Sequence, residues 1–137
     1  MAVTPSPLRY PGGKTAIMPM VSTFITENDL NNYHYVEPYA GGAGLALSLL
    51  FKNYVSHIHL NDLDISIWSF WHSILFETEA FIELIKSTEI TIDEWHQQRH
   101  IQEVKNEVDT LTLGFSTFFL NRTNRSGIIQ RAGVIGG

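Results

Sequence analysis

The stretch Glu37-Pro-Tyr-Ala-Gly-Gly-Ala-Gly44 decides the fold that we expect for this chain. It follows a short segment with strand character, Tyr33 to Pro38, and precedes an apolar segment, Leu45 to Phe51, that favours a buried helix. Because glycine has no Cβ, a glycine turn at such a place lets backbone approach a bound nucleotide closely. The alternative is that these glycines only make a tight turn between the strand and the helix.

A second strand is predicted from Val55 to Leu60, and it ends at Asn61-Asp62. Asp62 lies 20 residues after Gly42, where a carboxylate can accept hydrogen bonds from ribose hydroxyls. The dinucleotide fingerprint Gly-x-Gly-x-x-Gly is incomplete, because Leu47 stands where its third glycine belongs. We therefore expect a nucleoside without phosphates, of which S-adenosylmethionine is the common example. A nicotinamide cofactor is the disfavoured alternative.

The rest of the chain is predicted to be mostly helical. Residues 4–14 favour a loop, and the helix after it carries Ile17, Val21, Phe24 and Ile25 on one apolar face, with Pro19 in its first turn. Further helices are expected over residues 65–76 and, after a break near residue 77, over 81–85. The capping box Thr91–Glu94 predicts a helix that starts at residue 92. A last helix is expected over 111–119, before a polar loop that begins at residue 121. This order opens a doubly wound α/β sheet. Two strands do not make a stable open sheet of that kind, so we expect further strands from elsewhere or a larger parent protein.

Composition and charge narrow the possible classes of protein. The chain has 137 residues, enough for one domain, and 44% of them are hydrophobic, which excludes wholesale disorder. It has no cysteine, which excludes disulfide scaffolds, thiolate metal sites and cysteine nucleophiles. It has no run of 18 apolar residues and no signal peptide pattern, so we expect a soluble cytoplasmic protein that does not enter a membrane.

The formal net charge of −5 argues at first against a nucleic-acid partner, but the charges are unevenly distributed. All 14 acidic residues lie between Glu27 and Asp109, so both ends of the chain carry cations alone. If the ends meet in space, they form a cationic face on an acidic body; otherwise the distribution is chance. The segment from Asn121 to Gly127 adds amides, hydroxyls and two guanidinium groups, which suit base edges and phosphates as well as an ordinary solvated loop.

Two other motifs are rejected. Gly12-Gly13-Lys14-Thr15 resembles the end of a phosphate-binding loop, but Leu8 occupies the position of the first glycine and no strand precedes it. His96 and His100 are four residues apart on a polar helix, yet no glutamate stands beside the first histidine as in zinc proteases. We assign no metal ligand.

Taken together, four segments resemble the D12 class of DNA adenine methyltransferases, the deoxyadenosine methylase type. The N-terminal motif is matched by Arg9-Tyr-Pro-Gly-Gly-Lys14 and the first cofactor motif by Glu37 to Gly44. The second cofactor motif is matched by Asn61-Asp62, and the start of the target-recognition region by Phe119-Leu-Asn-Arg122 with Ser126-Gly127. The order and spacing agree over roughly residues 7–137.

The resemblance implies an incomplete Rossmann-like methyltransferase fold that binds S-adenosylmethionine and flips an adenine out of double-stranded DNA. It implies that residues 1–76 belong to the cofactor-binding domain and residues 77–137 to the start of a helical target-recognition region. The implied cofactor-binding residues are Tyr10, Gly12, Gly13, Lys14, Glu37, Tyr39, Ala40, Gly41, Gly42, Gly44 and Asp62. The implied DNA-binding residues are Arg122, Asn124, Arg125 and Ser126.

One departure from the family pattern concerns catalysis. The catalytic motif of this family is Asp-Pro-Pro-Tyr, and no Pro-Pro occurs in these 137 residues. We therefore assign no catalytic residue and expect an N-terminal part of a methyltransferase, either a truncated gene product or an expressed fragment. The alternative is a non-catalytic module that binds the cofactor, DNA or a partner.

Overall fold

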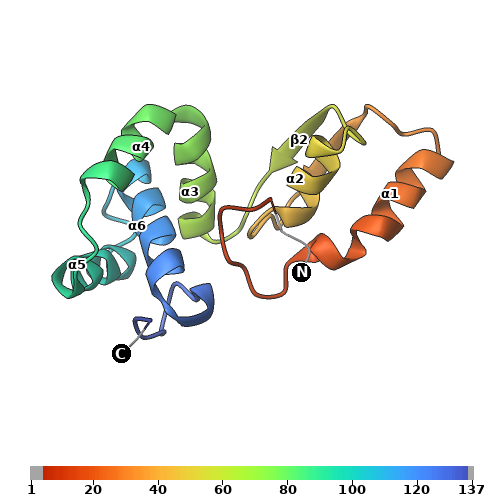
Figure 1. Cartoon of the computed structure of the whole chain (residues 1–137). Coiled ribbons are helices and arrows are strands. Elements are labelled where there is room, and N and C mark those ends of the chain that lie inside the picture. Colours follow the sequence, from red (N-terminus) through yellow and green to blue (C-terminus); the bar gives the residue numbers. More distant parts are fainter. Residues whose placement is uncertain (1–4, 136–137) are drawn as a thin grey trace. The chain divides into compact units, whose positions relative to one another are not determined.

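The computed structural model describes residues 5–135 (Figure 1). The chain divides into two compact units, residues 1–62 and 63–137. The functional division expected at residue 76 does not coincide with this boundary, because the helix over residues 65–76 packs within the second unit. Each unit is described by itself below.

The first unit is a helical segment followed by a strand, a helix and a second strand. Its elements are the 3-10 turn η1 (Lys14–Ile17), α1 (Met18–Glu27), β1 (His34–Glu37), α2 (Gly44–Phe51) and β2 (His57–Leu60). The strands are parallel, with His34 opposite His57 and Glu37 opposite Leu60. Both predicted strands, the glycine turn and the helix after it are therefore confirmed. This small parallel sheet is compatible with an incomplete methyltransferase fold, and a larger Rossmann-like sheet is not formed within residues 5–135.

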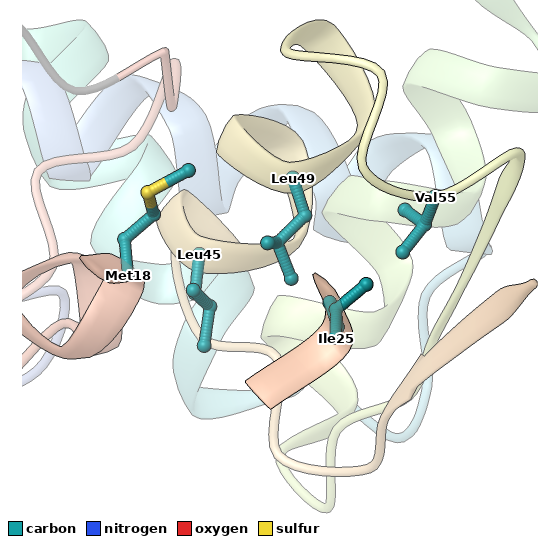
Figure 2. Packing of buried hydrophobic residues seen from close by; sticks show 5 residues of the cluster. All are labelled: Met18, Ile25, Leu45, Leu49 and Val55. Carbon is teal, nitrogen blue, oxygen red and sulfur yellow. The ribbon is translucent and has the colours of Figure 1, made fainter. Parts of the chain in front are cut away.

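The core of this unit joins α1 and α2 with the segment that leads into β2. Figure 2 shows Met18 and Ile25 of α1 facing Leu45 and Leu49 of α2, with Val55 beside them. Leu45 and Leu49 are one helical turn apart, so both fall on the face of α2 that meets α1.

The apolar face predicted for α1 is partly wrong. Ile25 is buried as expected, but Phe24 is 60% exposed and Ile17 precedes the first helical residue. The buried face instead runs through Met18, Ser22 and Ile25. Ser22 is tolerated there because its hydroxyl donates a 3.0 Å hydrogen bond to the Pro19 carbonyl, which satisfies the buried polar group.

The face of the sheet that is turned away from this core carries three imidazoles. Side chains alternate along a strand, so Tyr35 and Ile58 pack against the core while His34, His57 and His59 are exposed. The Nδ1 atom of His34 lies 2.9 Å from Nε2 of His59, and the rings of His34 and His57 are 4.6 Å apart. Each strand has one hydrogen-bonded neighbour in the described part of the chain.

The second unit is helical. Its elements are α3 (Ile65–Phe76), α4 (Thr78–Ser87), α5 (Ile92–Glu103), α6 (Thr110–Thr123) and the short turn η2 (Arg125–Gly127). The predicted bounds of α3 are confirmed, as is the break at Glu77. The predicted start of α5 at Ile92 is confirmed, and the Thr91 hydroxyl accepts a 3.1 Å hydrogen bond from the backbone N–H of Glu94. The second bond of the predicted capping box is not formed, because the Thr91 N–H donates to the Glu89 carbonyl at 3.2 Å. None of the helices among residues 5–135 is long and apolar enough to cross a bilayer.

Helix α6 packs along α3 and α5. Gly114 allows the close approach to α3, since a Cβ at this position would lie 2.6 Å from the Ser69 carbonyl oxygen. The contact with α5 is polar: the Gln102 amide accepts a 2.8 Å hydrogen bond from Ser66 and donates to the hydroxyls of Ser116 and Thr117. These hydrogen-bonded groups hold α5 in place, although the exposed face of α5 is almost entirely hydrophilic.

The polar loop predicted from Asn121 begins later than expected, because α6 continues to Thr123. Thr123 donates a 2.8 Å hydrogen bond from its hydroxyl to the Phe119 carbonyl, and Asn121 is completely buried. A polar composition therefore did not end the helix, since its polar groups are satisfied within the fold.

Candidate functional sites

The first candidate site lies at the carboxyl ends of the two parallel strands. Glu37 is the last residue of β1, and Asp62 follows β2 by two residues. The backbone N–H of Asn61 donates to the Glu37 carbonyl at 3.1 Å, and the N–H of Ala40 donates to the Asn61 carbonyl at 2.8 Å. These bonds extend the pairing beyond the strands and hold the glycine turn beside Asp62. In open α/β sheets this edge is where ligands bind.

Glu37 is the buried centre of this site, with 2% exposure. Its Oε1 atom lies 2.9 Å from the Lys14 ammonium, and Oε2 accepts a 3.2 Å hydrogen bond from the backbone N–H of Ala46 in the first turn of α2. Lys14 also donates to the Tyr39 carbonyl at 2.5 Å. Burial raises the pKa of the Tyr35 phenol, and the negative charge of Glu37 raises that pKa further. Glu37 thus ties the N-terminal loop and α2 to the end of β1.

The glycine turn is shaped around Tyr10. A Cβ at Gly41 would lie 2.7 Å from Cε1 of the Tyr10 ring, and a Cβ at Gly42 would lie 2.9 Å from its Cβ. Gly41 also has a φ of +50°, and its N–H donates a 2.8 Å hydrogen bond to Oδ2 of Asp62. The close approach predicted for these glycines is therefore made, within the chain, by a tyrosine that itself matches a family cofactor position.

The remaining residues predicted for the cofactor lie around this turn or on the loop that precedes η1. Ala40 is buried, Tyr39 is 69% exposed, and Gly44 is the first residue of α2. Gly13 comes directly before η1, and Gly12 has a φ of +75° with open space around the position of a Cβ. The structure thus brings Tyr10, Lys14, Glu37, the glycine turn and Asp62 together.

The second candidate site surrounds the end of α6. Arg122 is exposed in the last turn of α6, and Arg125 and Ser126 are exposed in η2. Ser126 has a φ of +56°, a backbone conformation that costs energy for a residue with a side chain. Two exposed arginines and a hydroxyl therefore lie close together in sequence, at the end of α6 and in η2.

Asn124, also predicted to contact DNA, has a different place. It is completely buried. Its Oδ1 atom accepts a 2.7 Å hydrogen bond from the Trp95 indole, and its Nδ2 atom donates to the carbonyls of Ile128 and Ile129 at 2.7 and 3.2 Å. The prediction from sequence is corrected here: the Asn124 side chain holds the loop after α6 and does not face solvent.

Sequence reasoning included Asn121 in the polar segment but missed its supporting role, and it gave Trp95 no part in this site. Asn121 is buried and donates from Nδ2 to the Gly127 carbonyl at 2.8 Å, so it supports the same turn from inside the helix. The spacing of Asn121 and Asn124, three residues apart, was the available signal, because such residues face the same side of a helix. Trp95 is 29 positions away, and nothing local in the sequence pairs it with Asn124.

Comparison with known proteins identifies the family of the chain. The family model of the D12 class N6 adenine-specific DNA methyltransferases matches residues 10–134, which include both candidate sites. Searches of curated proteins and of solved structures found no match. Since the family model covers nearly the whole sequence, the chain belongs to the D12 class N6 adenine-specific DNA methyltransferase family.

Proposed function

We propose that this chain provides the cofactor-binding site and part of the DNA-contacting surface of a cytoplasmic enzyme that methylates the N6 amine of adenine in double-stranded DNA. S-adenosylmethionine is the proposed methyl donor. The observation that carries the proposal is the grouping of Lys14, Glu37 and Asp62 around a glycine turn at the carboxyl ends of two parallel strands. Residues 1–76 would serve cofactor binding and residues 77–137 target recognition.

The side chains at the carboxyl ends of the strands suit the binding of a cationic nucleoside. Asp62 has a carboxylate that can accept hydrogen bonds from ribose hydroxyls, and it is held in place by Gly41. The Tyr10 ring lies against the turn and remains 43% exposed, so it offers an aromatic surface for stacking. When bound, S-adenosylmethionine supplies the electrophilic methyl group. The residues of this chain would orient it, with Asp62 at the ribose and Tyr10 beside the glycine turn.

The DNA contacts in this proposal come from the turn after α6. Arg122 lies in the last turn of α6, where the helix limits its reach, and this favours a phosphate contact. Arg125 is the first residue of η2, beyond the end of α6, which favours contact with a base edge. Ser126 would add a hydroxyl toward phosphate.

Calorimetric titration of the protein with S-adenosylmethionine, S-adenosylhomocysteine and NAD tests the cofactor assignment. We expect both adenosyl compounds to bind and NAD not to bind, because the third glycine of the dinucleotide fingerprint is replaced by Leu47. Binding of NAD in preference to the adenosyl compounds would overturn the proposal in favour of a nicotinamide-dependent enzyme.

A second candidate function is a module that binds cofactor or DNA without catalysis. It is favoured by the absence of adjacent prolines from all 137 residues, and therefore of the Asp-Pro-Pro-Tyr motif. Transfer of tritiated methyl groups to adenine-containing duplexes separates the two candidates. We expect this chain alone to bind without transferring methyl groups. Cofactor-dependent transfer by the purified chain would show that a different set of residues performs the chemistry.

A further inference from the structure

The second unit contains a pocket of about 310 Å³ between the end of α5 and the segment that follows η2. This volume is at the lower end of the range for ligand pockets, about 300–1,000 Å³. Its lining is rich in cations and amides, from Arg99, Gln102, Glu103, Lys105, Gln130 and Arg131. The pocket is lined by three cationic side chains and one carboxylate, whereas the whole chain has a net charge of −5. The pocket therefore favours an anion.

One of these cations, Arg99, is oriented by a buried pair that also holds the segment preceding Arg131. The Arg99 guanidinium lies over the Trp95 ring at 5.0 Å from its centroid, which orients it by a cation–π contact. Trp95 in turn donates to Asn124, whose Nδ2 atom holds the carbonyls of Ile128 and Ile129. The Trp95–Asn124 pair thus orients Arg99 on one wall of the pocket and also holds the segment that leads to the opposite wall.

The backbone supports the placement of the opposite wall. Arg131 has a φ of +60°, a left-handed conformation that costs a residue with a side chain about 1–2 kcal/mol. At the start of η2, the backbone N–H of Arg125 donates to the Gly133 carbonyl at 3.0 Å, and the N–H of Ile135 donates to the Thr123 carbonyl at 2.8 Å. Strain maintained by such bonds is typical of functional positions.

The other charged residues around the pocket have partners of their own. Lys105 lies 3.3 Å from Oδ1 of Asp64, and Glu103 lies 3.5 Å from Nδ1 of His100. The pair with Asp64 reduces the net positive contribution of Lys105, whereas the contact of Glu103 is with a histidine and is not counted as an ion pair. Arg99 and Arg131 therefore supply most of the positive potential that an incoming anion would meet.

We propose that this pocket binds a phosphate of the DNA backbone, at a place separate from the turn that carries Arg122 and Arg125. The inference rests on the proposed function, since it takes DNA as the ligand. Guanidinium groups bind phosphate oxygens through paired hydrogen bonds, and the Gln130 amide adds a further donor. None of the described residues that line the pocket has an aromatic ring on which a base could stack. The contact fixes the protein on the duplex and carries no sequence information.

The test measures affinity for matched and scrambled duplexes over a series of salt concentrations. We expect Arg99→Gln and Arg131→Gln each to weaken both duplexes equally, by about tenfold at low salt. Each should also reduce the slope of log K against log salt concentration by about one unit. Arg99→Lys and Arg131→Lys keep the charge and should largely keep the slope. Lys86→Gln, which removes an exposed cation of α4, is the matched control and should change neither quantity.

The outcomes distinguish this proposal from the one on which it rests. If the parent protein binds duplex DNA and the two glutamine variants behave like Lys86→Gln, the pocket is not a phosphate site while the proposed function stands. If Arg99→Gln or Arg131→Gln relaxes the preference for the matched duplex, the contact is to a base and the phosphate assignment is wrong. Failure of the folded parent to bind any duplex would overturn the proposed function and this inference with it. Unfolding temperatures of each variant identify losses that come from misfolding.

Discussion

The carboxylate of Asp62 accepts a 2.8 Å hydrogen bond from the backbone N–H of Gly41, so the residue proposed to hold the ribose also fixes the glycine turn. This single bond links the end of β2 to the turn that follows β1. A substitution of Asp62 can therefore act on ligand binding, on the turn, or on both. Two different substitutions separate these effects.

Asp62→Ala is expected to lower affinity for S-adenosylmethionine by about 1.5–3 kcal/mol, the worth of a hydrogen bond to a charged group. Asp62→Asn keeps an oxygen that can accept from Gly41, so it should preserve the turn while still weakening ligand binding. Calorimetry gives the affinity and denaturant unfolding gives the stability. Asp93→Asn, at an exposed position in the first turn of α5, is the control. Unchanged affinity in both Asp62 variants would remove Asp62 from the site.

Gly41→Ala is expected to destabilise the protein more than Gly12→Ala. Both glycines have positive φ, which costs alanine about 1–2 kcal/mol. Only at Gly41 would the new Cβ lie 2.7 Å from the Tyr10 ring, and such overpacking typically adds about 1–3 kcal/mol. The difference should disappear when each change is made in a Tyr10→Ala background. A difference that persists there would locate the cost elsewhere.

Asn124→Ala is expected to destabilise the protein by about 2 kcal/mol or more. It leaves the buried Trp95 indole N–H without its acceptor and the carbonyls of Ile128 and Ile129 without their donor. Trp95→Phe removes one of these bonds and should cost less, and the double variant should cost less than the sum. Asn106→Ala, at an exposed asparagine, should stay within about 0.5 kcal/mol of the parent. Additive effects of Asn124→Ala and Trp95→Phe would show that the pair is not coupled.

Arg122→Ala and Arg125→Ala are expected to weaken DNA binding in different ways. The loss at Arg122 should be equal for all sequences, with the salt slope reduced by about one unit, as for a phosphate contact. The loss at Arg125 should be about 1–3 kcal/mol for a matched duplex and should relax the preference at one base position. Competition binding against matched and scrambled duplexes at two salt concentrations measures both. If both variants bind like the parent, this turn is not a DNA contact.

Asp109 should contribute to stability in a pH-dependent way. Hydrogen bonds from the backbone N–H of Thr112, and then from its hydroxyl, lower the pKa of Asp109 below its ordinary value of 3.8. A lowered folded-state pKa means that the stabilisation is present above about pH 3.8 and is lost as the pH falls through the folded-state value. Asp109→Ala should cost about 1 kcal/mol at pH 7, and Asp109→Asn much less, because asparagine also caps helices well. The gap between the parent and Asp109→Ala should narrow on acidification, as measured by denaturant unfolding. A constant gap from pH 7 to pH 2 would exclude the charged cap.

Local patterns were sufficient for much of this fold. Both strands, the turn from Gly41 to Gly44 and the start of α5 at Thr91 depend on backbone propensities and caps, which act between residues close in sequence. The buried face of α1 was mispredicted because Phe24 is apolar but has no partner in the core cluster, whereas Ser22 satisfies its own hydroxyl. A pattern of hydrophobic residues does not show that a buried hydroxyl can form a hydrogen bond within its own helix.

The candidate sites were harder to predict because they depend on contacts between distant residues. The bond from Gly41 to Asp62 could be anticipated from strand order, since parallel strands end at the same edge. The pairing of Lys14 with Glu37 and the packing of Tyr10 on the turn require the N-terminal loop to fold back, which no periodicity indicates. For the same reason Asn124 was expected at the surface, although its partner Trp95 makes it a buried residue.

The two-stranded sheet has a consequence for the colloidal behaviour of this protein. Since β1 and β2 each have one neighbour among the described residues, each strand also has an edge that can act as a template for a strand of another molecule. Val36, which is 62% exposed, adds apolar surface on the face of β1 that also carries His34. The imidazoles of His34, His57 and His59 interrupt that surface with polar groups, as natural edges often do. Aggregation by strand addition should therefore begin at this sheet, and concentrated solutions of the protein should gain β-structure as they age.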